Sequence, residues 1–275
     1  MTILLLITVL LCCCNRIETE SAPGIRLVVI SPELAEIAAM VAGVRVIVGI
    51  TRECDYPPAL SEVPVVGTFS NIDLEKVKAI NPTVVLTSGL EQEGINQELR
   101  KLGFATVSIY PQSIEELFAA VLEIGEITGC SERAKNIADS LDIIYEELLQ
   151  EIPRTRFLRT YIEIYGNPLM SAADNSLVGE VIALAGGKNI FPELPRNYSR
   201  VNPENVIVAD PEFIVITYPG VSKQDILQRK GWENISACVE GRICTTADIN
   251  PDLIIRATPR IFNGIRKLQE FINEK

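Results

Sequence analysis

Two short segments of the chain carry a glutamate in the same place. Residues 74–86 and 203–216 both contain an early glutamate, a valine two residues later, a proline and then an apolar strand, and the two glutamates, Glu75 and Glu204, keep a spacing of 129 (75 to 204). A carboxylate in the first turn of a helix interacts favourably with the helix dipole. Two exposed carboxylates at matched positions could also dock a symmetric basic partner, whereas their expected separation argues against paired acid–base catalysis. The repeat predicts two similar lobes.

Near the C-terminus, Asp252 and Arg256 lie four residues apart. On a helix this spacing puts both side chains on one face, where they can form an ion pair. A surface salt bridge is one interpretation. Beside a cleft, the same pair would present an acceptor and a rigid donor fork to a polar ligand.

Four aromatic residues, Tyr56, Phe69, Tyr165 and Tyr198, fall in predicted loops beside Pro, Gly, Ser or Asn. Core packing would explain each of them singly. In a two-lobed protein they could instead line the cleft, where they would offer apolar area and hydroxyl groups to a ligand.

The composition argues against most catalytic chemistry. None of the 275 residues is histidine, which excludes a Ser-His-Asp triad, a Cys-His dyad and imidazole ligation of a metal. The phosphate-binding motifs GxGxxG and GxxxxGK[ST] and the nucleophile motif GxSxG are also absent. The net charge of −11 argues against nucleic acid and anionic membrane surfaces as partners. The sequence therefore favours a binding protein over an enzyme, with no cofactor and no metal site.

The first residues resemble an export signal. Residues 2–11 carry no charge and precede Cys12, Cys13 and Cys14. About ten apolar residues are too few to span a bilayer, which needs roughly twenty, but they match the hydrophobic part of a secretion signal. A cysteine at this point is typical of a bacterial lipoprotein, and Cys14 is our candidate for lipidation. We expect a protein exported to the periplasm or the outer face of the cytoplasmic membrane, where only a lipid anchor touches the membrane; a buried N-terminal strand is the alternative.

Four further cysteines follow, at positions 54, 130, 238 and 244. Export would permit disulfides, and Cys238 and Cys244 flank a probable turn across which they could pair. Buried free thiols explain the four residues equally well.

Strand and helix patterns alternate along most of the chain, which indicates an α/β fold with mainly parallel sheets. Expected elements include strands at 25–30, 45–50, 83–87 and 105–109, helices at 71–80 and 91–102, and a last helix at 259–274. Residues 113–152 instead show forty residues of helical spacing, interrupted at Gly129. The expected organisation is a signal peptide (1–14), an N-terminal α/β lobe (25–112), a helical region with a long connecting helix (113–152) and a C-terminal α/β lobe (153–275).

Several motifs together resemble one known family. In the N-terminal half they lie at 54–58 (CDYPP), 66–71 (VGTFSN) and 74–82, and in the C-terminal half at 186–191 (GGKNIF), 231–242 and 256–261 (RATPRI). In this order and spacing they resemble the helical-backbone (class III) periplasmic substrate-binding proteins of ABC importers, and most closely the cobalamin-binding subgroup. The resemblance implies two Rossmann-like lobes joined by a rigid helix, with ligand held between them.

The resemblance also implies roles for particular residues. Glu75 and Glu204 would dock on arginines of the permease dimer, which works with its ATPase subunits. Phe69 and Tyr198 would face a corrin ring, and Asp252 and Arg256 would contact its side-chain amides. The remaining candidate ligand residues are Tyr56, Tyr165 and Ser88, the last replacing an aromatic residue of the subgroup; Glu53 replaces another.

Three functions follow as hypotheses. The first is an exported binding protein that captures a corrinoid such as cobalamin and delivers it to an ABC importer. The second is the same fold with a ferric siderophore or haem as ligand. The third, from a different class, is a two-lobed α/β enzyme such as a sugar transferase.

Overall fold

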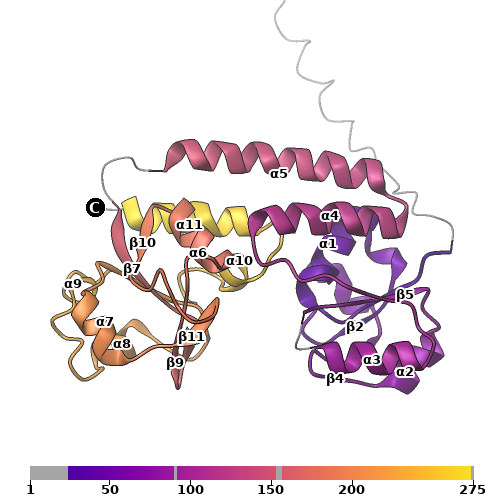
Figure 1. Cartoon of the computed structure of the whole chain (residues 1–275), viewed down its shortest axis with the longest axis horizontal. Helices are drawn as coiled ribbons and strands as arrows, with labels where there is room; N and C mark the ends of the chain where they lie inside the picture. Colours follow the sequence, from indigo (N-terminus) through magenta and orange to yellow (C-terminus); the bar gives the residue numbers. More distant parts are fainter. Residues whose placement is uncertain (1–23, 90–91, 153–156, 274–275) are drawn as a thin grey trace, which may run out of the picture.

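Two lobes lie side by side below a layer of long helices (Figure 1). This computed structural model describes residues 24–89, 92–152 and 157–273. We call the part from β1 to β6 the N-lobe and the part from β7 to α11 the C-lobe. The export signal and the lipidation candidate Cys14 lie outside the described residues.

The N-lobe is built on one six-stranded sheet with the order β4-β3-β2-β1-β5-β6, parallel except for the edge strand β4. The apolar strands β2 and β1 lie at its centre and are almost entirely buried, which fits strands covered by helices on both faces. The N-lobe elements are β1 (Leu27–Val29), α1 (Pro32–Ala42), η1 (Val44–Val46), β2 (Ile47–Thr51), η2 (Pro58–Glu62), β3 (Val65–Thr68), β4 (Asn71–Ile72), α2 (Leu74–Ile80), β5 (Val84–Thr87), α3 (Glu93–Lys101) and β6 (Thr106–Ser108).

The C-lobe combines a parallel sheet, β10-β7-β12-β13, with a small antiparallel sheet, β11-β9-β8. Its strands are β7 (Leu158–Glu163), β8 (Tyr165–Gly166), β9 (Leu169–Ala172), β10 (Gly187–Asn189), β11 (Tyr198–Arg200), β12 (Phe213–Ile216) and β13 (Ile243–Cys244). Its helices are α6 (Leu177–Leu184), α7 (Pro203–Ala209), α8 (Lys223–Leu227), α9 (Ser236–Val239), α10 (Asp252–Ile255) and α11 (Ile261–Asn273).

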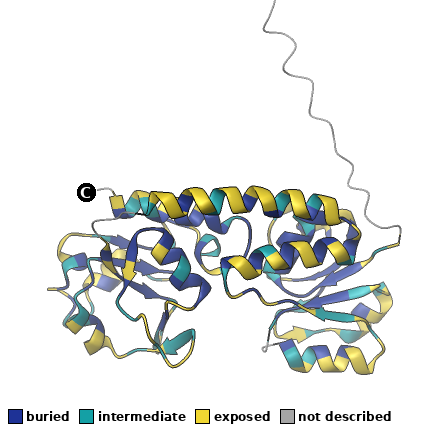
Figure 2. Cartoon of the chain, turned by 45° about the horizontal axis from the view of Figure 1, so that its top comes forward, coloured by how far each residue is buried: buried dark blue, intermediate teal, exposed yellow. Residues whose placement is uncertain are grey.

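The helical layer joins the lobes. Helix α4 (Ile114–Thr128) ends at Gly129, whose positive φ of 72° suits a glycine cap, and α5 (Ser131–Glu151) runs back across both lobes (Figure 1). One face of α5 is buried and the other exposed (Figure 2). The Phe118 ring of α4 lies 6.1 Å from that of Tyr145 on α5 and 6.3 Å from that of Phe262 on α11. Aromatic packing thus connects helices from both halves of the chain.

The repeat seen in the sequence extends through the structure at the same spacing. Helices α2 and α7 begin at the caps Asp73 and Asn202, whose side chains accept backbone N–H bonds. They end at Asn81 and Asp210, the two non-glycine residues with positive φ in the described part of the chain. The buried valines, Val77 and Val206, and the strands β5 and β12 follow the same register. The prediction of two similar lobes is confirmed.

Several sequence predictions need correction. The helix predicted at 71–80 begins only at Leu74, because Asn71 and Ile72 pair with β3 and Asp73 caps the helix. Tyr165 and Tyr198 lie in short strands rather than loops. Of the two interpretations of the cysteines, the structure supports the second: Cys54, Cys238 and Cys244 are buried free thiols, and Cys130 is also buried.

Candidate functional site

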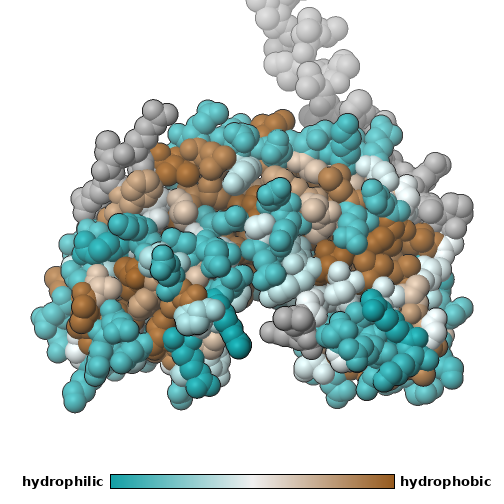
Figure 3. Space-filling view, in the orientation of Figure 1, coloured by the Kyte–Doolittle hydropathy of each residue, from teal (hydrophilic) through white to brown (hydrophobic). Residues whose placement is uncertain are grey.

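A cleft of about 670 Å³ lies between the lobes. The loops after β1, β3, β5 and β6 enter it, which is where ligands bind in open α/β sheets. Figure 3 shows the surface hollowed between the lobes on the side away from α5. The lining residues are Glu33, Phe69, Ser88, Gly89, Tyr110, Gln112, Arg196, Asn197 and Tyr198.

A smaller cavity of about 140 Å³ adjoins this cleft. Both share four lining residues, Glu33, Tyr110, Gln112 and Tyr198. The smaller cavity adds Arg256 and the apolar residues around it. The two together form one site, with Arg256 in the lining of its smaller part.

The buried amide of Gln92 holds the N-lobe wall of the cleft in place. Its Nε2 donates to the carbonyl oxygens of Ile30 (2.7 Å) and Phe69 (2.9 Å), and its Oε1 accepts the backbone N–H of Ser88 (2.7 Å). These three residues follow β1, β3 and β5, so one side chain ties three loops together. Nothing in the sequence pattern had singled out Gln92.

Two carboxylates complete this wall. The Ser88 hydroxyl donates to Glu33 at 2.8 Å, and Glu53 accepts the backbone N–H of Phe69 at 2.9 Å. Ser88 and Glu53 stand where the family resemblance led us to expect aromatic rings. Here both make hydrogen bonds instead, and Ser88 is buried.

The C-lobe wall rests on the strand β11. Tyr198 at its start is half-buried, and burial raises the pKa of its hydroxyl to about 12, so it stays protonated at neutral pH. The neighbouring Asn197 donates to Gln112 across the cleft at 3.1 Å. An aromatic ring and a carboxamide from this lobe therefore face the N-lobe wall.

Arg256 is bound by carboxylates from both lobes. Its Nε lies 3.0 Å from Asp252, as the four-residue spacing predicted, and its Nη1 lies 2.8 Å from Asp55. Burial raises the pKa of the Asp252 carboxyl. The pair is therefore not a free donor and acceptor at the cleft, because Asp55 of the N-lobe takes part in it.

Three predicted ligand residues, Tyr56, Tyr165 and Asp252, lie outside the linings of both cavities. Asp252 forms the ion pair with Arg256 described above. Tyr165 has 52% of its surface exposed and packs against Tyr218, with ring centroids 6.1 Å apart. Tyr56 is 39% exposed, and its ring lies under the guanidinium of Arg260. The structure therefore brings Phe69, Ser88, Tyr198 and Arg256 together and leaves these two tyrosines at the side.

A buried ion pair underlies Tyr165. Glu163, at the end of β7, is fully buried and receives both terminal nitrogens of Arg229, at 2.6 and 2.7 Å. The hydroxyls of Tyr161 and Tyr218 also donate to this carboxylate. All four groups are therefore satisfied, and the cluster supports the hairpin that carries Tyr165.

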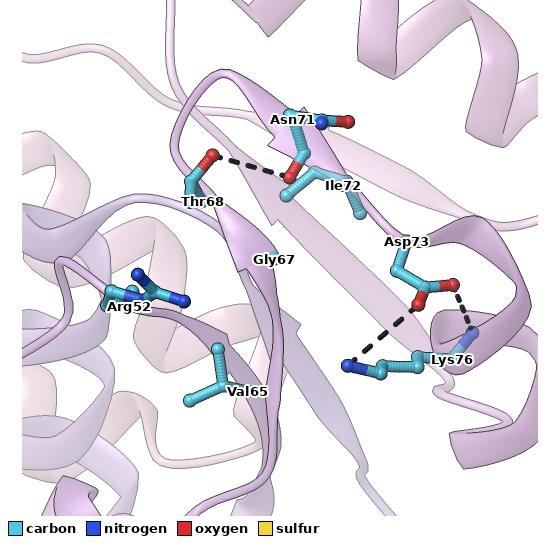
Figure 4. A pocket seen from close by; sticks show the side chains of 8 residues that line it. All are labelled: Arg52, Val65, Gly67, Thr68, Asn71, Ile72, Asp73 and Lys76. Atoms are coloured by element: carbon cyan, nitrogen blue, oxygen red, sulfur yellow. Dashed lines mark hydrogen bonds and ion pairs between the residues drawn. The ribbon is translucent and has the colours of Figure 1, made fainter.

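Glu75 and Glu204 are exposed and lie outside the cleft. Their helices, α2 and α7, are at the ends of the lobes away from α5, one on each side of the hollow (Figure 1). A pocket of about 270 Å³ adjoins α2 within the N-lobe, with Arg52 and Val65 on one side and Asp73 and Lys76 on the other (Figure 4). The helices that carry the matched glutamates thus lie on the same side of the molecule (Figure 1).

The sequence did not indicate six of the residues that line the larger cavity: Glu33, Gly89, Tyr110, Gln112, Arg196 and Asn197. Two of them carried a usable signal. Glu33 and Tyr110 come within a few residues of the ends of the predicted strands β1 and β6, and the ends of parallel strands meet at one edge of a sheet. The same rule applied to every predicted strand would have found both.

Within the described ranges, no group of three or more His, Cys, Asp or Glu residues could hold a metal ion. In that same part of the chain, no helix is both long and apolar enough to cross a membrane.

Comparison with known proteins relates this geometry to a family. The model of the periplasmic binding protein family matches residues 27–256. A vitamin B12-binding protein of Salmonella paratyphi A is 26% identical over 245 residues, or 88% of each chain. An uncharacterized ABC transporter substrate-binding lipoprotein of Bacillus subtilis, YvrC, is 24% identical over 82% of this chain and 73% of its own.

A solved structure shows the same fold. The periplasmic haem-binding protein BhuT, in complex with two haems, superposes with a TM-score of 0.78 over 90% of this chain and 98% of its own, at 18% identity. The α/β fold with two lobes predicted from the sequence is therefore confirmed. The chain belongs to the periplasmic binding protein family, and it is a binding protein for transport rather than an enzyme.

Proposed function

We propose that this protein captures a corrinoid, such as cobalamin, outside the cytoplasm and delivers it to the permease of an ABC importer. One observation carries the proposal. Phe69 and Tyr198, which occupy equivalent positions in the two repeats (69 and 198), line the same cavity from opposite lobes. Two aromatic side chains facing one space suit a large flat ligand, because ring faces offer apolar area without hydrogen-bonding demands.

The polar groups of the cleft support an amide-bearing ligand. Gln112 and Asn197 each present a carboxamide, which can both donate and accept hydrogen bonds. Arg256 is already paired with two carboxylates, so it offers little charge to an anionic ligand. A corrin ring is surrounded by carboxamide side chains and matches these groups. The cleft is open on one side, so a ligand larger than the cavity can protrude (Figure 3).

Haem is the main rival, since a haem-binding protein shares the fold. The chain has no histidine, so only tyrosine could serve as the usual axial ligand. A tyrosine binds iron as phenolate, and burial holds the pKa of Tyr198 at about 12. Burial therefore disfavours Tyr198 as an iron ligand, whereas Tyr110 also lines both cavities.

Delivery would use Glu75 and Glu204. Both are exposed at the start of equivalent helices, which lie on the side of the lobes away from α5 (Figure 1). Matched carboxylates on both lobes suit a permease dimer that presents basic residues from each of its two subunits. We further propose that Cys14 carries a lipid anchor, because the relative from Bacillus subtilis is a lipoprotein.

Calorimetric titration of the purified protein tests the ligand. We expect one-to-one binding of cyanocobalamin with submicromolar Kd, which corresponds to roughly 8 kcal/mol or more. Haemin and a ferric hydroxamate serve as parallel titrants. Binding of either with higher affinity than cyanocobalamin would contradict the corrinoid assignment.

A further inference from the structure

Arg260 connects the two lobes. It lies in the C-lobe between α10 and α11, and its Nε and Nη2 each lie 2.7 Å from a carboxylate oxygen of Glu36. Glu36 belongs to α1 in the N-lobe and is only 2% exposed. This parallel two-bond geometry is the strongest form of an arginine–carboxylate contact.

The same guanidinium also covers an aromatic ring. Its central carbon lies 3.7 Å from the centroid of the Tyr56 ring, which is well inside the range of a cation–π interaction. Tyr56 follows β2 in the N-lobe and is a candidate ligand residue. One C-lobe side chain therefore contacts two separate elements of the N-lobe.

The neighbouring Arg256–Asp55 contact also crosses between the lobes, but it differs in burial. The Asp55 side chain is 60% exposed, and solvent-exposed ion pairs contribute little to stability. Removing one partner of a buried pair leaves an uncompensated charge and costs far more. The Arg260 contact should therefore control the arrangement of the lobes more strongly than the Arg256 contact does.

We propose that Arg260 is a positioning residue that holds the two lobes at one separation before ligand arrives and keeps Tyr56 in place at the side of the cleft. The fork on Glu36 fixes α1 against the start of α11. The stacked ring fixes the loop after β2. The effect on ligand binding rests on the proposed function, whereas the effect on the lobes does not.

The separation of the lobes is measured directly by double electron–electron resonance. Spin labels are attached at Lys78→Cys on α2 and Val208→Cys on α7, both exposed, in a chain with serine at positions 12–14. The four described native cysteines are buried, which limits their labelling. We expect one narrow distance distribution for this labelled protein without ligand, and a broader one after Arg260→Met.

Matched variants separate this role from a general loss of structure. Arg260→Lys keeps a charge for Glu36 but loses the fork, so it should restore the narrow distribution in part. Arg159→Met is the control, because Arg159 pairs with Asp210 and Glu212 inside the C-lobe and should leave the distribution unchanged. If Arg260→Met does not fold, Glu36→Gln replaces it, since a neutral amide keeps the shape and weakens the contact.

Titration with cyanocobalamin provides the second measurement. Loss of the Tyr56 contact should lower the affinity of Arg260→Met by less than about tenfold, because Tyr56 lies outside both cavity linings. An unchanged distance distribution in a folded Arg260→Met protein would overturn the proposal, whatever the titration shows. If the unaltered protein does not bind cyanocobalamin, the proposed ligand is wrong, but the distance measurement still decides the role of Arg260.

Discussion

The two lobes carry equivalent helices, α2 and α7, at their outer ends, by which we mean the ends away from α5 (Figure 1). Where the lobes face each other, the charged side chains that they contribute are mostly of opposite sign. Each outer end presents one glutamate in the first turn of an equivalent helix. Where the lobes meet, the N-lobe contributes the carboxylates Glu33, Glu36 and Asp55, whereas the C-lobe contributes the guanidinium groups Arg196, Arg256 and Arg260 and one carboxylate, Asp252. The likeness suits a symmetric partner, and the difference lets the lobes attract each other. The same repeated fold thus provides one surface suited to a symmetric partner and a second surface at which the two lobes contact each other.

The lobes also support their cleft walls differently. In the N-lobe the neutral amide of Gln92 ties three loops together. In the C-lobe the buried ion pair of Glu163 and Arg229 supports the β8–β9 hairpin, whose strand β9 pairs with the wall strand β11. A neutral network leaves only unsatisfied hydrogen bonds when it is broken, but a broken ion pair leaves a buried charge. The C-lobe should therefore be the more sensitive of the two to substitution.

The largest effect should come from reversing the charge of both matched glutamates at the outer ends of the lobes. The double substitution Glu75→Lys and Glu204→Lys should abolish ligand uptake in cells that express the importer, because like charges would then meet at both contacts. Cyanocobalamin affinity, measured by calorimetry, should stay unchanged. As a control, Glu123→Lys with Glu146→Lys on the outward side of α4 and α5 should leave uptake intact. Equal losses of binding and uptake would refute the docking role.

Next in size is Arg229→Met in the C-lobe. It leaves Glu163 buried without its cation, so the free energy of unfolding should fall by about 3–5 kcal/mol. Urea denaturation followed by circular dichroism measures this change. Arg159→Met, which removes exposed ion pairs in the same lobe, should cost less than about 1 kcal/mol. Similar losses of unfolding free energy in Arg229→Met and Arg159→Met would contradict the expectation that the buried ion pair contributes more to stability than the exposed ones.

In the N-lobe, Gln92→Met should cost about 1–3 kcal/mol, because three backbone groups lose their partner. The same denaturation experiment measures it, and the cost should be smaller than that of Arg229→Met. Affinity for cyanocobalamin should also fall, since the loops carrying Phe69 and Ser88 are released. Gln97→Met serves as the control, because Gln97 is exposed on α3 and bonds only within that helix. A larger loss of unfolding free energy in Gln92→Met than in Arg229→Met would contradict the expectation that the C-lobe is the more sensitive to substitution.

The cleft aromatics should contribute comparably from both lobes. Phe69→Ala and Tyr198→Ala should each weaken cyanocobalamin binding about tenfold, as loss of one buried ring contact predicts. Calorimetric titration measures both. Tyr165→Ala, whose ring lies outside the two cavities, should have a smaller effect. If Tyr165→Ala weakens binding most, the ligand must lie further toward the β8–β9 hairpin than we propose.

The smallest effect concerns acid stability and compares Asp210 with its N-lobe counterpart, Asn81. Backbone and side-chain hydrogen bonds from Ser236, together with Arg159, lower the pKa of Asp210. This carboxylate therefore adds stability above its unfolded-state pKa of about 3.9, and the gain is lost as the pH falls through the lower folded-state pKa. The difference in unfolding free energy between the original protein and Asp210→Asn should be full at neutral pH and decline below about pH 4. If the difference in unfolding free energy between the two proteins did not change with pH, the stabilising role of the Asp210 carboxylate would be contradicted.

Local patterns determined much of the fold. Helix caps, glycine at the end of α4 and apolar periodicity act over a few residues, so the main strands and helices and the two-lobe repeat could be predicted from residue order alone. Short strands were missed, because β8, β10 and β11 depend on partners elsewhere in the chain. The same limit explains why the sequence could not decide between a disulfide and free thiols for Cys238 and Cys244, of which one lies on a helix and the other in the sheet.

In the binding site, too, some features could be predicted from the sequence and others depended on the tertiary structure. Phe69 and Tyr198 could be named from the sequence because both follow one repeated pattern, and the ion pair of Asp252 with Arg256 follows from helical spacing. Tertiary structure alone decided that Asp55 shares Arg256, that Gln92 ties three loops and that Arg260 joins Glu36 across the lobes. Asp55 and Arg256 are 201 positions apart, and Glu36 and Arg260 are 224 apart. Contacts over such distances depend on how the lobes pack, and no local pattern of residues encodes that packing.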